Sequence, residues 1–168
     1  SEKKIFDWRV PKIWNIKDAY IKYRGKKIVD FKKNNLHLVG YSVPVKKKMK
    51  LNNLDKYLHY DKTKPSLIPY VTSYYKKNWG FCISENQKSN LPDGKYKVFI
   101  DSKHFKGKLN YGELVLKGKS KKEVFLSTYI CHPALANNEI SGPSLLTYLS
   151  KWIKSKKRRY TYRIIFIP

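Results

Sequence analysis

The sequence predicts an α/β fold, in which a parallel or mixed sheet with one strand–helix–strand (βαβ) unit is accompanied by a small β-rich α+β domain. The βαβ unit follows from residues 121–168, where two apolar strand-like segments flank a segment with helical spacing. The β-rich domain follows from residues 5–105, where aromatic and β-branched residues alternate with turn signals. A length of 168 residues and a hydrophobic fraction of 41% suit about one domain with a small companion.

The N-terminal part predicts short strands joined by turns. Residues 5–31 read as strands on either side of a turn at Arg24-Gly25. Residues 35–45 alternate apolar and polar side chains and predict a further strand, which Pro44 places towards a sheet edge because proline cannot donate to a ladder.

The middle of the chain predicts two short helical segments around a β-rich run. The first rests on the helical spacing of Leu51, Leu54 and Leu58. Residues 63–84 then predict β structure, and Ser84 can cap a helical turn ahead of the turn signal at residues 92–94.

The C-terminal part predicts four strands and one long helix. The strands are expected within residues 95–104, 108–118, 121–133 and 159–168. The strand in 121–133 reads as buried on both faces, because its middle is a run of apolar residues. Ser141 is expected to cap the helix, with Pro143 in its first turn. Its apolar face is expected to consist of Leu145, Leu146, Leu149, Trp152 and Ile153.

The formal net charge of +25 has two readings. One is a binding surface for a polyanion such as nucleic acid. The other is compositional drift on solvated faces, which the spread of lysine through every segment favours, since arginine occurs at only five positions. Nucleic acid is therefore a possible partner but not the favoured one, although basic clusters at residues 46–48 and 154–159 keep it open.

The number of cysteines and the length of the apolar runs indicate where in the cell the protein is expected. Cys82 and Cys131 are the only two cysteines, which is no disulfide framework, so a cytoplasmic location is expected. No apolar run reaches the roughly 18 residues that a membrane span needs.

Residues 131–142, Cys-His-Pro-Ala-Leu-Ala-Asn-Asn-Glu-Ile-Ser-Gly, raise the possibility of a metal site. His132 offers an imidazole nitrogen, Glu139 a carboxylate and Asn138 a weaker carbonyl ligand, and the first two are usual zinc ligands. A purely structural turn explains the same residues, because asparagine and serine cap helices and an early glutamate complements the helix dipole. A Cys131–His132 nucleophile–base pair is disfavoured, since neighbours on a strand point to opposite faces.

The stretch from Ser127 to Ile153, followed by Arg158 to Pro168, resembles the aminopeptidase-like family of bacterial polysaccharide-biosynthesis loci. That family is similar to the co-catalytic zinc aminopeptidases, in which a strand ends in His-x-Asp and a later Asp-Asp-Asn-Ala-Ser-Gly opens a helix. Residues 6–21, 35–45 and 68–84 also resemble the β-rich domain inserted in that family. The resemblance thus covers nearly the whole chain.

The resemblance implies a division of the chain and a partial zinc site. Residues 1–17 would lead into the peptidase-like domain, residues 18–107 would form the inserted β-rich domain, and residues 108–168 would form a truncated aminopeptidase-like α/β segment. The family's histidine ligand falls on His132, while its two aspartate positions fall on Ala134 and Asn138, with Glu139 one position along.

The catalytic base and the remaining ligands of the family are expected beyond Pro168, so the chain reads as a fragment that is inactive alone. The function implied is part of a zinc-dependent aminopeptidase-like hydrolase acting on a peptide or related amide, with Tyr74, Tyr75 and Trp79 shaping the substrate mouth. The alternatives are an inactive binding or scaffold module of surface-polysaccharide biosynthesis and a lysine-rich polyanion-binding protein.

Overall fold

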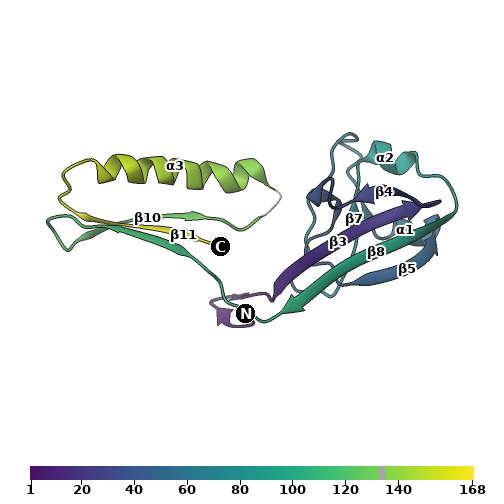
Figure 1. Ribbon diagram of the computed structural model, residues 1–168, viewed down its shortest axis with the longest axis horizontal. Helices are drawn as coiled ribbons and strands as arrows, with labels where there is room; N and C mark the ends of the chain where they lie inside the picture. The colour runs from purple at the N-terminus through teal and green to yellow at the C-terminus, as the bar shows by residue number, and fades with distance from the viewer. Residues whose placement is uncertain (133–134) are drawn as a thin grey trace. The chain divides into compact units, whose positions relative to one another are not determined.

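The computed structural model describes residues 1–132 and 135–168, and the chain divides into two compact units, Ser1–Gly107 and Lys108–Pro168. Each unit combines strands with short or long helices, which confirms the predicted α/β class (Figure 1). The sequence places a domain boundary after residue 17. In the structure this position lies in the middle of strand β3 (Ile13–Tyr23), which belongs to the first unit. Within the described residues, no helix is long and apolar enough to cross a membrane.

The unit Ser1–Gly107 is built on a four-stranded antiparallel sheet. Its order is β4 (Lys26–Asp30), β3, β8 (Lys95–Phe105) and β5 (Val45–Lys50). The smaller elements are β1 (Lys4–Ile5), β2 (Trp8–Arg9), the 3₁₀ helix η1 (Asn35–His37), α1 (Leu51–Asp55), β6 (Leu58–His59), β7 (Phe81–Cys82) and α2 (Glu85–Ser89).

The core of this unit lies on one face of the sheet. Strand β8 alternates strictly, with Tyr96, Val98 and Ile100 buried between exposed or half-buried neighbours, as a sheet with one covered face requires. The covering layer includes α1, which contributes Leu54, and β7, which contributes Phe81, and both side chains are fully buried.

The strand predicted for residues 35–45 is not formed, and this prediction was wrong. The Asn34 side chain caps η1 by accepting the N–H of Leu36, and Tyr41 takes a positive φ of 63°, which no extended strand allows. The Ser42 hydroxyl donates to the carbonyl of Val39 and closes the turn. Pro44 directly precedes β5, which is an edge strand, so its predicted position was right.

The β-rich run predicted for residues 63–84 is mostly irregular, and only β7 forms a strand there within the described chain. Single backbone hydrogen bonds replace a ladder: Gly40 N–H donates to Val71 O, and Ser73 N–H donates to Gly40 O. The two short helices are confirmed as α1 and α2, and the Ser84 hydroxyl caps α2. Leu58 lies outside α1, in β6.

The unit Lys108–Pro168 contains the predicted βαβ unit. Strand β10 (Glu123–Tyr129) pairs in parallel with β11 (Thr161–Ile167), and helix α3 (Ala136–Lys154) connects them (Figure 1). Strand β9 (Gly112–Leu116) pairs antiparallel with the other edge of β11, so the sheet is mixed. A small core between α3 and the sheet consists of Leu116, Leu146, Ile153 and Ile164.

Three predictions for this unit were wrong in detail. Strand β10 is not buried on both faces: it alternates, and Phe125 is 60% exposed, because α3 covers one face of the sheet only. Helix α3 begins at Ala136, so Ser141 and Pro143 lie inside it rather than at its start. Leu145 and Trp152 are exposed, because the face that packs on the sheet is centred on Leu146, Leu149 and Ile153.

Candidate metal centre

The candidate site lies where the chain leaves β10 and enters α3. Strand β10 ends at Tyr129, and the N–H of Ile130 still donates to the carbonyl of Ile167 at 2.7 Å. Cys131 and His132 follow in irregular backbone, and Glu139 lies in the first turn of α3. The site is therefore at the carboxyl end of a parallel strand, the edge where ligands bind in α/β sheets.

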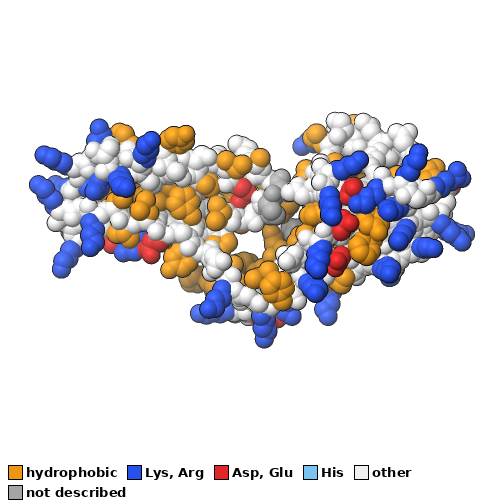
Figure 2. All heavy atoms as spheres, in the orientation of Figure 1, with side chains coloured by type: hydrophobic (Ala, Val, Ile, Leu, Met, Phe, Trp, Pro, Cys, Tyr) orange, Lys and Arg blue, Asp and Glu red, His pale blue; other side chains and the backbone are white. Residues whose placement is uncertain are grey.

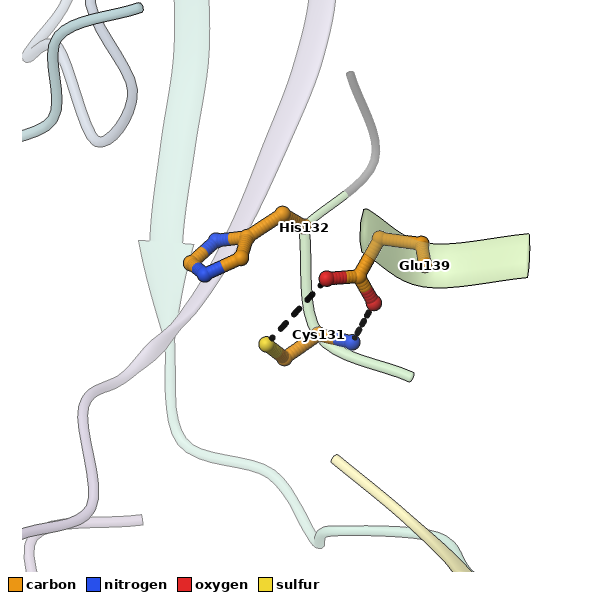
Figure 3. A group of neighbouring side chains, drawn as sticks. All are labelled: Cys131, His132 and Glu139. Atoms are coloured by element: carbon orange, nitrogen blue, oxygen red, sulfur yellow. Dashed lines mark hydrogen bonds between the residues drawn. The ribbon is translucent and has the colours of Figure 1, made fainter. Parts of the chain in front are cut away.

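Cys131, His132 and Glu139 form one cluster of potential ligands (Figure 3). One ligand atom from each residue lies within 4.8 Å of the other two. The Cys131 thiol donates to one oxygen of the Glu139 carboxylate at 3.6 Å, and the Cys131 backbone N–H donates to the other oxygen. Glu139 is thus held towards the loop by a residue eight positions earlier in the chain.

The electrostatics of the cluster centre on Glu139. Partial burial opposes its charge, but the N–H groups of Cys131 and His132 outweigh this and lower the pKa of the carboxyl. Partial burial, with the neighbouring Glu139 carboxylate adding to it, raises the pKa of the Cys131 thiol. The cluster therefore holds a carboxylate whose charge the backbone favours, next to a thiol that keeps its proton.

The structure brings His132 and Glu139 together, as their expected role requires, and adds Cys131. Strand alternation does not apply to Cys131 and His132, because β10 ends two residues before Cys131. Asn138 is exposed in the first turn of α3. Ala134 lies outside the described residues. The adjacency of cysteine and histidine was the signal that could have identified Cys131.

The donor set suits zinc. Thiolate sulfur, imidazole nitrogen and carboxylate oxygen are the three side-chain ligand types that zinc takes in proteins. A catalytic zinc site keeps three protein ligands and one open position. Each of the three side chains here is of a type that zinc can take as a ligand.

A pocket of about 290 Å³ lies in the unit Ser1–Gly107. Tyr74 and Tyr75 line it together with Tyr41, whose ring lies 4.7 Å from that of Tyr74. The Tyr75 hydroxyl donates to the carbonyl of Arg9 at 3.2 Å and so ties the two sides of the pocket. Trp79, expected beside the two tyrosines, is 7% exposed and stacks on Tyr57 in the core instead.

The rim of this pocket is cationic. Arg9, Lys12, Lys76 and Lys77 line it, and Glu2 is the one carboxylate among the described lining residues. Glu2 pairs with Lys12 at 3.5 Å and with Lys106 at 3.6 Å. The pocket thus combines aromatic walls with an excess of positive charge.

The three remaining histidines have structural environments. His37 Nδ1 lies 2.8 Å from the carbonyl of Cys82, and His104 Nε2 lies 3.2 Å from the carbonyl of Tyr41. Burial lowers the pKa of His59. His37 and His104 thus each contact a main-chain carbonyl of their own unit.

Comparison with known proteins gives a consistent relationship. The family model described as a domain of unknown function, DUF2172, matches residues 13–103. A Clostridium acetobutylicum protein, provisionally named a polysaccharide biosynthesis protein with aminopeptidase-like domain, is 48% identical over the whole chain. The crystal structure of a provisionally named peptidase from the same organism superposes with a TM-score of 0.94, at 48% identity. The chain spans 39% of the first relative and 40% of the second.

Proposed function

The chain belongs to the DUF2172 family, is similar to a protein with an aminopeptidase-like domain, and on that premise we propose that it is part of a zinc-dependent hydrolase. The proposed substrate is a peptide or a related amide. The observation that supports the proposal is the convergence of Cys131, His132 and Glu139 at the carboxyl end of β10.

Each residue of the cluster would have a separate role in binding the metal. His132 and Glu139 would hold the metal, and Cys131 would join them as a thiolate once its proton is lost. A bound zinc ion would supply Lewis acidity towards an amide carbonyl and would lower the pKa of a water molecule. The two N–H groups that favour the charge of Glu139 would keep the carboxylate ionised and aimed at the loop.

Metal titration of the chain tests this assignment. We expect one zinc ion per chain by isothermal titration calorimetry, with proton release that reflects deprotonation of the Cys131 thiol. His132→Ala and Glu139→Gln should each weaken zinc binding at least tenfold, because each removes one of three ligands. Cys131→Ser should weaken binding and also abolish most of the proton release.

Asn137→Ala is the matched control, because Asn137 is exposed in the same helical turn as Glu139. It should leave zinc binding unchanged, and circular dichroism should show that all variants are folded. Equal zinc stoichiometry in wild type and His132→Ala would reject His132 as a ligand. A folded full-length protein that binds no divalent metal would instead support the alternative of a non-catalytic module of polysaccharide biosynthesis.

We further propose that the tyrosine pocket contributes to substrate binding in the complete protein. Tyrosine presents a flat apolar ring and a polar hydroxyl, which suits a ligand with both kinds of surface. Tyr75 is 61% exposed, so its ring is accessible. The burial of Trp79 in the core speaks against a direct contact between that residue and a substrate.

Tyr75→Ala should raise the KM of the full-length hydrolase for its amide substrate about tenfold and leave kcat within twofold, because the ring would bind substrate and transition state alike. Tyr111→Ala serves as control, since Tyr111 is similarly exposed in the other unit. An unchanged KM for Tyr75→Ala would remove the pocket from the substrate site.

A further inference from the structure

The outer face of the four-stranded sheet carries a group of six lysines, here called the lysine face. Its members are Lys22 on β3, Lys95 and Lys97 on β8, and Lys46, Lys48 and Lys50 on β5. Side chains of β8 alternate, and the neighbours of Lys97 along the strand, Tyr96 and Val98, are buried in the core. Lys97 and its cross-strand partners therefore point away from the core.

The strand register places like charges directly opposite each other. Lys97 is the cross-strand partner of Lys22 on one side and of Lys48 on the other, and Lys95 is the partner of Lys50. Like charges directly opposite in a sheet destabilise it. In Figure 2, Lys and Arg side chains gather on the side of this unit where β3, β5 and β8 lie.

Carboxylates of the same sheet do not compensate the lysine face. Asp18 and Asp30 lie within salt-bridge distance of Lys27, at 3.8 and 3.1 Å. Asp101 lies further along β8, opposite Asp18. Among the described residues, no salt bridge within 4.0 Å reaches any of the six lysines of the face.

The aromatic rings beside the lysine face already contact one another or a lysine side chain. Tyr20 and Phe99 are cross-strand partners whose rings stack at 5.0 Å. The ammonium groups of Lys22 and Lys27 lie 4.9 and 4.8 Å from the centre of the Tyr20 ring. Proteins that hold single-stranded nucleic acid offer open aromatic rings for the bases, often together with arginine. The lysine face contains no arginine, and its neighbouring rings face each other or a cation.

We infer that the lysine face binds an acidic polysaccharide, a chain of sugars carrying carboxylates. Neighbouring strands lie about 4.8 Å apart, so a row of ammonium groups across three strands presents cations at roughly the spacing of successive sugar residues. Carboxylates bound there would relieve the repulsion between opposite lysines. The inference concerns a separate face of Ser1–Gly107 and does not depend on the proposed hydrolase function.

The experiment measures binding of polygalacturonate oligosaccharides to the chain by fluorescence anisotropy across a salt series. Neutral dextran and a single-stranded uridine oligonucleotide of equal charge serve as comparison ligands. We expect polygalacturonate to bind at low salt, with an affinity that falls linearly on a log–log plot as counterions are released. The triple variant Lys22→Gln, Lys48→Gln and Lys97→Gln should lose at least tenfold in affinity and show a shallower salt slope.

The matched control is the triple variant Lys119→Gln, Lys121→Gln and Lys157→Gln, which removes the same charge from exposed lysines of the other unit. It should bind polygalacturonate within twofold of wild type. Equal losses in both triple variants, or no binding at low salt, would overturn the inference. Tighter binding of the oligonucleotide, lost in the first triple variant alone, would reassign the face to nucleic acid and overturn the polysaccharide.

Unfolding curves establish that the first variant is folded, and relief of repulsion should leave it at least as stable as wild type.

Discussion

Replacing Phe81 by alanine is expected to destabilise the unit Ser1–Gly107 by about 3–5 kcal/mol, the usual cost of emptying a buried phenylalanine site. Phe81 is 0% exposed and belongs to the buried core cluster of this unit. Strand β7 pairs it with Leu58, and an isolated bridge joins it to Leu38. Leu38, Leu58 and Phe81 belong to three separate segments of one buried cluster, so the movement of one segment cannot be expected to close the cavity.

Urea denaturation followed by hydrogen exchange and mass spectrometry measures the effect, because peptides from the two units report separately. Phe6→Ala is the control: it makes the same chemical change at a side chain that is 93% exposed, and should cost less than about 0.5 kcal/mol. A loss below about 1 kcal/mol for Phe81→Ala would show that the covering layer is not packed as described.

Ile164→Ala is expected to destabilise the unit Lys108–Pro168 by about 2–5 kcal/mol. Ile164 is fully buried on β11, the central strand of the mixed sheet, where it packs with Leu116, Leu146 and Ile153. These four buried residues form the whole described core cluster of the unit, so one large cavity removes much of its apolar contact.

The same exchange experiment should show faster exchange in peptides of β9, β10 and β11, and no change in those of β3 and β8. Ile140→Ala changes an exposed position of α3. It should alter the free energy of exchange by less than about 0.5 kcal/mol, both in the peptides of β9, β10 and β11 and in those of β3 and β8. Protection of β11 that is equal in Ile164→Ala and wild type would contradict the assignment of this core.

The predictions that held rest on local chemistry. Ser84 caps α2 because a serine hydroxyl can reach an N–H three residues ahead, whatever the rest of the chain does. The turn at Arg24-Gly25 was recognisable because glycine accepts positive φ readily. Both residues adopt positive φ in the structure. The order strand, helix, strand in residues 123–167 implied parallel pairing, because only a crossover connects parallel strands.

The predictions that failed concern residues whose environment is set by distant segments. Residues 35–45 alternate like a strand, yet Leu38 and Val39 are buried against segments around residues 71 and 80 that no local pattern announces. Phe125 looked buried because it is apolar, but burial depends on which face of β10 the helix covers. Trp79 looked like part of a binding surface, whereas its ring stacks on Tyr57.

By itself the sequence determined the fold class, the strand–helix–strand unit and the placing of His132 and Glu139 at its strand–helix junction. Those follow from periodicity and from the rule that parallel strands end at a common edge. Only the tertiary structure decided that Cys131 joins them, since that depends on where β10 ends and on how the first turn of α3 directs Glu139 back to the loop. It alone also decided that lysines far apart in sequence face each other across three strands, because register is a property of pairing.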